Sequence, residues 1–175
     1  MLKIIALTVT IPLIALLAFA ATRPDTFRVQ RASSVNAPPE KIFPLINDLQ
    51  RWRAWSPYEK KDPAMKRTLS GTSHGPGAVY EWEGNKDIGK GRMEIIDAAP
   101  PSRVRIALDF VKPFEAHNIV EFTLEPNGGS TKVTWAMHGS SPYLAKLMSI
   151  FFSMDSMVGK DFEAGLANLK AVAES

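Results

Sequence analysis

The chain of 175 residues contains no cysteine and carries little net charge. The absence of cysteine excludes disulfides, thiol nucleophiles and cysteine-ligated zinc or iron–sulfur sites. The 21 basic side chains face 18 acidic ones, which leaves a net charge of +3 and no basic stripe typical of nucleic-acid binding. We therefore predict no nucleic-acid partner. The three histidines (His74, His117 and His138) form no closely spaced ligand pair, so we also predict no metal site.

Apolar side chains dominate residues 1–21, where Lys3 is the only charged residue. A membrane-spanning helix needs about 20 apolar residues, so the run from Ile4 to Ala21 fits a single-pass anchor. It also fits a cleaved secretory signal, in which Lys3 is the basic start and Ala18-Phe19-Ala20 the cleavage site. Both interpretations predict a membrane partner for residues 1–21. Because a short basic leader usually stays inside, they favour an extracytoplasmic domain, which is secreted or periplasmic if the signal is cleaved.

A polar linker, residues 22–25, separates this segment from the predicted domain, residues 26–173. Alternating apolar residues predict a strand over 26–36, and Asn36-Ala37-Pro38-Pro39 predicts the start of a helix with Asn36 or Ala37 as its cap. Beyond it the apolar period changes to two. Turn residues separate six further candidate strands, which are 64–70, 77–83, 90–97, 102–110, 114–125 and 131–138.

The short connections between these strands predict an antiparallel sheet with one buried face. From Ser141-Pro142 onward, apolar residues recur at spacings of three and four, which predicts a long C-terminal helical region. Gly159 and Gly165 are candidate points at which this region bends or divides. The order of elements indicates an α+β fold, with a curved antiparallel sheet around the C-terminal helix and two short helices after the first strand.

Several stretches of this sequence resemble one protein family. They are Ser34–Phe43 with its Ala-Pro-Pro-Glu-Lys core, Asn47–Pro57 with its Trp-x-x-Trp-Ser-Pro ending, Gly91–Ile95, Pro113–Asn118 and Thr131–Met137. With the order of elements, they resemble the START-like superfamily, also called SRPBCC or Bet v 1-like, in its polyketide cyclase/dehydrase and lipid transport branch. The resemblance implies a helix-grip fold and an apolar cavity between the sheet and the C-terminal helix. It implies a hydrophobic small molecule or lipid as the ligand. We predict no cofactor.

Ten residues are the candidate lining of this cavity. From the strands they are Tyr80, Trp82, Met93, Phe110, Phe114, Asn118 and Trp135, and from the C-terminal helical region they are Met148, Phe151 and Met154. Asn118 is the one amide in the set, in phase with Phe114, Ala116, Val120 and Phe122. A buried amide needs a partner. The alternatives are a structural hydrogen bond to the backbone or Tyr80, and a polar contact that orients an apolar ligand.

Two other functions stay open at this point. A polyketide cyclase or dehydratase needs an acid–base pair inside the cavity, and its candidates, Asp109, Glu81, Arg92 and His117, all phase outward. We therefore assign no catalytic residue. A protein-interaction module with a filled core would instead expose a large apolar patch. The glycine-rich stretch Gly71–Gly77 lacks the ending of a phosphate-binding loop and is predicted to connect two strands.

Overall fold

The structure is a computed structural model that describes residues 2–175, with side chains from residue 10 onward. The strands are β1 (Thr26–Val35), β2 (Lys66–Gly71), β3 (Ala78–Glu83), β4 (Lys90–Ala99), β5 (Arg103–Lys112), β6 (Ala116–Asn127) and β7 (Ser130–Ser140). The helices are α1 (Leu2–Ala21), α2 (Pro39–Asn47), the 3-10 helix η1 (Leu49–Ala54), α3 (Tyr58–Lys61), α4 (Tyr143–Met148) and α5 (Met154–Glu174). These elements confirm the predicted α+β fold class.

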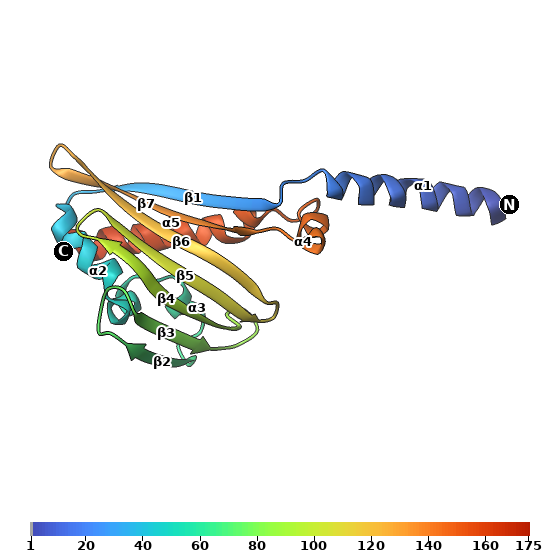
Figure 1. The fold of residues 1–175 in the computed structure, drawn as a ribbon. Coiled ribbons are helices and arrows are strands. Elements are labelled where there is room, and N and C mark those ends of the chain that lie inside the picture. The colour runs from blue at the N-terminus through green and yellow to red at the C-terminus, as the bar shows by residue number, and fades with distance from the viewer. Residues whose placement is uncertain (1) are drawn as a thin grey trace.

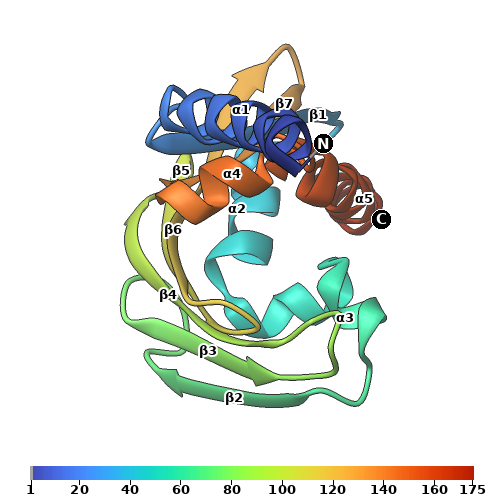
Figure 2. The same cartoon turned by 90° about the vertical axis from the view of Figure 1, so that its right-hand side faces the viewer.

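The strands form one antiparallel sheet of seven strands in the order β1-β7-β6-β5-β4-β3-β2 (Figure 1). Successive strands from β2 to β7 are neighbours, and β1 closes the sheet against β7. The sheet curves strongly, and α2 and α5 lie on its concave side (Figure 2). The predicted helix-grip arrangement is therefore confirmed, with α5 as the long C-terminal helix.

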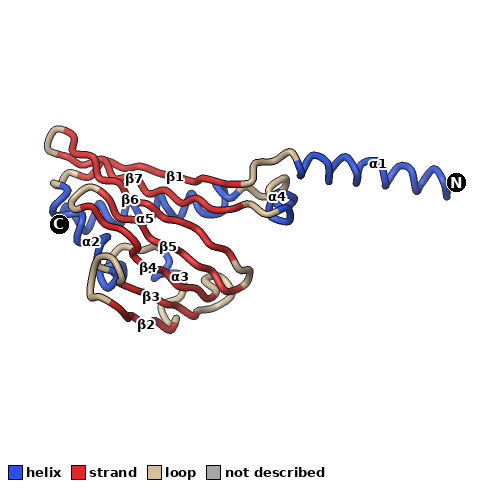
Figure 3. Tube along the Cα trace, viewed as in Figure 1, coloured by secondary structure: helices blue, strands red, loops and turns tan. Residues whose placement is uncertain are grey.

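The helices at the two ends of the domain differ in detail from the prediction. The N-cap of α2 is Pro38, not Asn36 or Ala37, and it makes no side-chain capping bond. The C-terminal helical region is divided, but between α4 and α5 instead of at either glycine (Figure 3). A new helix begins there because the Ser153 side chain accepts a hydrogen bond of 3.0 Å from the Ser156 backbone and caps α5.

Gly159 and Gly165 lie buried inside α5 and allow other elements to approach it. A Cβ on Gly165 would lie 2.6 Å from the Trp135 ring, and one on Gly159 would lie 2.2 Å from the Arg31 guanidinium. Distances below about 3 Å leave no room for a methyl group, so the two glycines are contact points between the helix and the sheet. Their predicted role as bends in the helix was wrong.

Helix α1 extends away from the sheet, and its C-terminal end lies against α4 (Figure 1). The Tyr143 hydroxyl donates a hydrogen bond of 2.9 Å to the Leu17 carbonyl. Across the part of the chain whose side chains are described, no helix combines the length and the apolar character that a membrane span requires. The anchor and the cleaved signal, which include side chains outside the described ones, gain no support from this result and stay predictions.

Candidate ligand-binding interior

The register of the sheet brings five of the predicted cavity residues together on the concave face, in two adjacent rows. They are Tyr80, Trp82, Met93, Phe110 and Asn118. Tyr80, Met93, Leu108, Asn118 and Gly139 are successive cross-strand partners from β3 to β7 and form one row. The adjacent row, two residues along each strand, contains Trp82, Gly91, Phe110 and Ala116. The Trp82 and Phe110 rings meet edge to face, with centroids 5.9 Å apart. The local alternation therefore placed Tyr80, Trp82, Met93, Phe110 and Asn118 on the correct face.

The opposite half of the interior is filled by aromatic side chains. Trp135 stacks on Phe162 of α5 with ring centroids 4.3 Å apart, and Phe122 lies 4.9 Å from Trp135. Trp52 and Trp55 of the η1 region complete this cluster at 4.7 Å from each other. All five side chains are buried. Trp135, predicted to line a cavity, is instead part of a packed core because Gly165 lets α5 approach it closely.

The half of the interior near the β5–β6 loop is covered less completely. Leu108 and Phe110 on the sheet are only partly buried, and so are Met154 and Val158 on the first turns of α5. Ile106 and Phe122, which lie on the same face toward the other end, are fully buried. We call the end of the concave face that contains the two rows the half-covered end. The partly buried apolar side chains pack against the core and remain partly open to solvent, and ligand sites are lined predominantly by apolar side chains.

Asn118 lies at the centre of the half-covered end and is 7% exposed. Its side-chain oxygen packs so tightly over β7 that a Cβ on Gly139 would lie 2.0 Å from Oδ1. No described residue forms a hydrogen bond with the Asn118 side chain. Tyr80, the partner considered from the sequence, donates its hydroxyl proton to Glu59 Oε1 at 2.6 Å instead. Of the two alternatives, the structural hydrogen bond of Asn118 is therefore not formed among the described residues.

The unpaired amide of Asn118 is not sealed inside the protein. Within the described part of the chain, the fully enclosed side-chain atoms without a partner are Asn47 Oδ1 and Trp135 Nε1. The nitrogen and oxygen of Asn118 are unpaired but are not in that class, so they border space that a water molecule reaches. An amide in this position satisfies its hydrogen-bonding capacity only with water or with a ligand.

Three of the predicted cavity residues lie outside the interior. Phe114 is in the loop between β5 and β6, because β6 begins only at Ala116, and it is 77% exposed. Met148 and Phe151 are 52% and 64% exposed, because α4 and the segment after it lie at the end of the sheet beside α1. Met154 alone of the helical set packs partly against the core. The period-based placement of the other three was wrong.

A second polar group at the half-covered end was missed from the sequence. Glu59 accepts the Tyr80 hydroxyl with one carboxylate oxygen and pairs with Arg67 Nε through the other at 2.7 Å. Burial and, second, the hydrogen bond to Glu59 raise the pKa of Tyr80, so its hydroxyl stays a donor. The three groups therefore satisfy one another. The sequence carries no local signal for this cluster, because its members lie on α3, β2 and β3.

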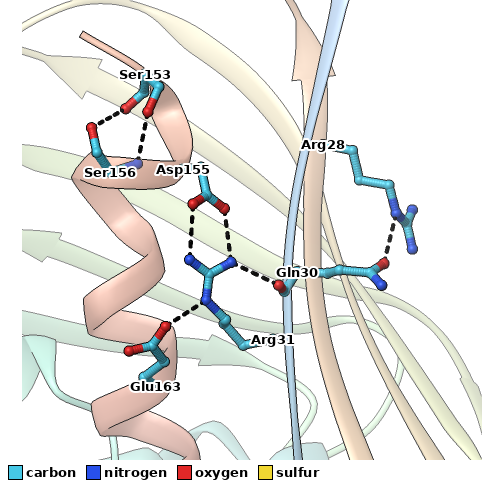
Figure 4. Close-up of polar contacts among 7 residues, drawn as sticks. All are labelled: Arg28, Gln30, Arg31, Ser153, Asp155, Ser156 and Glu163. Atoms are coloured by element: carbon cyan, nitrogen blue, oxygen red, sulfur yellow. Dashed lines mark hydrogen bonds and ion pairs between the residues drawn. The ribbon is translucent and has the colours of Figure 1, made fainter.

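An arginine holds α5 against the edge strand of the sheet (Figure 4). Arg31 of β1 donates two hydrogen bonds to Asp155, at 2.7 and 2.9 Å, and one to Glu163 at 2.6 Å. The hydrogen bond from Arg31 lowers the pKa of Asp155. Arg31 lies on the same face of its strand as the apolar residues. Asp155, Gly159 and Glu163 are spaced by four, so one helix face carries two carboxylates with a glycine between them. This spacing could have indicated the ion-pair site from the sequence.

The candidate acid–base residues lie on the opposite, convex face of the sheet. Glu81, Arg92, Asp109 and His117 are successive cross-strand partners there. His117 Nδ1 lies 2.7 Å from Asp109 Oδ1, which raises the pKa of His117, but the His117 side chain is 80% exposed. Within the described residues, no three His, Asp or Glu side chains are grouped to hold a metal ion. The predicted outward phase of all four residues is confirmed.

The Gly71–Gly77 stretch connects β2 to β3, as expected, and it borders a pocket of about 120 Å³ against η1. Its first five residues also have the Gly-x-Ser-x-Gly spacing. That motif acts at a turn between a strand and a helix, whereas this turn joins two antiparallel strands. Ser73 contacts only its neighbour His74 within the described hydrogen bonds, at 3.0 Å, so no nucleophile–base–acid series is assembled.

Comparisons with known proteins agree with this architecture. A family model described as polyketide cyclase / dehydrase and lipid transport matches residues 26–174. A solution NMR structure from Thermobifida fusca is 20% identical, with a TM-score of 0.61 over 83% of this chain and 92% of its own. CV1439 from Chromobacterium violaceum is 17% identical, with a TM-score of 0.60 over 87% of this chain and 99% of its own.

The ginseng major latex-like protein 151 from Panax ginseng is 12% identical, with a TM-score of 0.60 over 87% of this chain and 100% of its own. At these identities the solved structures show a shared fold. No curated protein was found to match the sequence.

Proposed function

The chain belongs to the polyketide cyclase/dehydrase and lipid transport family, and from this premise we propose that it binds a hydrophobic small molecule or lipid at the half-covered end of its interior. The unpaired, nearly buried amide of Asn118 is the observation that carries the proposal. In the free protein this amide can bond only to water, and a ligand with a hydrogen-bonding group can take the place of that water. Neighbouring apolar side chains supply the remaining contact surface.

The chemistry of the half-covered end favours an uncharged ligand. The charged groups described above on the concave side, Glu59 with Arg67 and Arg31 with Asp155, form ion pairs with each other. Burial of apolar ligand surface contributes roughly 25 cal/mol per Å² before the cost of ordering. A ligand with one carbonyl or hydroxyl group, placed at Asn118, and an apolar body against Phe110 and Met154 fits these features.

Membrane association is the second part of the proposal. The described part of α1 exposes large apolar side chains, among them Ile11, Ile14 and Phe19. An isolated helix of this kind is poorly compatible with water, because the exposed apolar surface gains free energy when it leaves water. Its attachment to α4 would keep the half-covered end near a bilayer in which hydrophobic ligands dissolve.

The ligand site is tested with Nile red, an uncharged dye with a carbonyl group, and the full chain. We expect saturable binding with a blue-shifted emission. Asn118→Leu keeps the volume of the side chain and removes the amide, so the affinity should fall by about 2–10-fold, the equivalent of one hydrogen bond. Asn127→Leu, at the exposed end of β6, is the matched control and should leave the affinity unchanged.

Thermal unfolding of the same variants separates binding from folding. Because Asn118→Leu removes an unpaired amide, we expect the unligated variant to be at least as stable as the natural chain. An unchanged dye affinity in a folded Asn118→Leu variant, or the absence of saturable binding to the natural chain, would contradict the proposed site.

A further inference from the structure

The α4 region has an inverted distribution of apolar and charged side chains. Lys146 is the only charged residue between positions 141 and 154, and it is 9% exposed because it pairs with Asp25. The large apolar side chains of the same stretch point outward: Leu144 is 67%, Met148 52%, Phe151 64% and Phe152 61% exposed. We call these four residues the apolar tip. In water this distribution is unfavourable, because apolar surface faces solvent while an ammonium group is withdrawn from it.

The apolar tip is continuous with α1. The Tyr143 hydroxyl of α4 bonds to the Leu17 carbonyl, and the two helices lie against each other (Figure 2). Arg23 marks the end of the apolar segment, and its guanidinium lies 5.6 Å from the centre of the Phe19 ring. An exposed cation at the end of an apolar helix is placed to meet lipid phosphates while the helix contacts acyl chains.

We propose that the apolar tip docks against a lipid bilayer, beside α1, and holds the half-covered end of the interior at the bilayer surface. This inference deepens the proposed function and rests on the membrane association proposed there. The half-covered end and the apolar tip lie at the same end of the sheet, because β1 begins and β7 ends beside α4 while β5 and β6 are joined there. A ligand leaving the bilayer would reach the interior without crossing water.

A bilayer fits this surface better than a second copy of the chain does. The exposed residues of α1 include Ile11, Leu13, Ile14, Leu17 and Phe19. With about 3.6 residues per turn, these positions are distributed around the whole circumference of the helix. A partner protein covers one stripe of a helix, whereas acyl chains surround it, so the continuous surface of α1 and the apolar tip indicates lipid.

The chain has no cysteine, so a single introduced cysteine can carry a specific label. We would label Phe152→Cys with an environment-sensitive fluorophore and add vesicles of phosphatidylcholine and phosphatidylglycerol that contain brominated acyl chains. Ile96→Cys is the matched control, since Ile96 is an exposed apolar residue of β4, 42% exposed. We expect a blue shift and quenching at position 152 and neither at position 96.

The other outcomes each overturn the inference. Vesicle binding without quenching at position 152 would show that α1 alone contacts the lipid. A label at position 152 that is shielded before vesicles are added, together with a doubled mass in light scattering, would show that a second copy covers the apolar tip. Absence of vesicle binding would refute the docking, whereas the Nile red titration tests the ligand site separately and without vesicles.

Discussion

Single residues decide where this interior is polar. Asn118 owes its position to Gly139, whose missing side chain leaves the space that Oδ1 occupies. The Tyr80 hydroxyl donates its hydrogen bond to Glu59. The two polar groups of this cross-strand row, Tyr80 and Asn118, therefore have different roles. Glu59 satisfies Tyr80, whereas Asn118 has no protein partner among the described residues. The hydrogen-bonding state of each group, and not its burial alone, therefore identifies the candidate ligand contact.

The Asp109–His117 pair gives a prediction of pH dependence. The hydrogen bond and charge of Asp109 raise the pKa of His117 above the ordinary histidine value of about 6.5. The pair therefore stabilises the fold below that ordinary value, and the contribution is lost as the pH rises through the raised pKa. NMR titration of the His117 ring should give a midpoint that moves down in Asp109→Asn.

Because the pair is exposed, its effect on stability should be small and salt-dependent. Asp109→Asn should lower the unfolding midpoint at mildly acidic pH and leave it unchanged at alkaline pH. A His117 midpoint that is the same with and without the Asp109 carboxylate would show that the pair does not form in solution.

At the scale of elements, α5 meets the sheet through two glycines with different neighbours. Next to Gly165 lie the Trp135 ring and Pro57, which are rigid groups in a packed core. Next to Gly159 lies the guanidinium of the long Arg31 side chain, which Asp155 and Glu163 hold in place. The first contact fixes how close the helix packs, and the second accommodates an ion pair across its surface.

This difference predicts unequal effects of the same substitution. Alanine gains up to about 1 kcal/mol over glycine in helix propensity, whereas overpacking a core costs about 1–3 kcal/mol. Gly165→Ala should therefore lower the free energy of unfolding by about 1–2 kcal/mol, measured in urea. Gly159→Ala, the matched control in the same helix, should cost less, because Arg31 can shift by weakening its exposed ion pair, and exposed ion pairs contribute little to stability. Equal stability of Gly165→Ala and the natural chain would contradict the close packing on Trp135.

At the scale of the whole molecule, the interior has a packed half and a half-covered end. The packed half contains the aromatic cluster around Trp135, and the half-covered end contains Asn118 and lies beside α4. The sheet and α5 run through both halves. One fold therefore contains a rigid core and a region in which side chains are less closely packed. Such a division lets a protein bind a ligand without losing its core.

Hydrogen exchange should report this division. Backbone amides at 108–110 and 116–118 should exchange faster than those at 120–124 and 133–137, because fewer side chains cover them. Nile red should slow exchange in the first group and leave the second group unchanged. Uniform protection across both groups, or a dye effect confined to the aromatic cluster, would contradict the division.

The sequence by itself determined the class of fold and the inward face of each strand. Alternation along a strand is a local property, so Trp82, Phe110 and Asn118 could be assigned to the concave face without knowing their neighbours. The family followed from short motifs such as Trp-x-x-Trp-Ser-Pro, and its model matches residues 26–174.

Only the tertiary structure decided which inward residues are packed and which are accessible. Trp135 and Asn118 both face inward, but the approach of α5 and η1, set by Gly165 and distant aromatic rings, fills the space beside Trp135 alone. The exposure of Phe151 depends on how α4 meets α1, and the partner of Tyr80 comes from α3. These contacts join residues far apart in the chain, and the periodicity of a single segment contains no information about them.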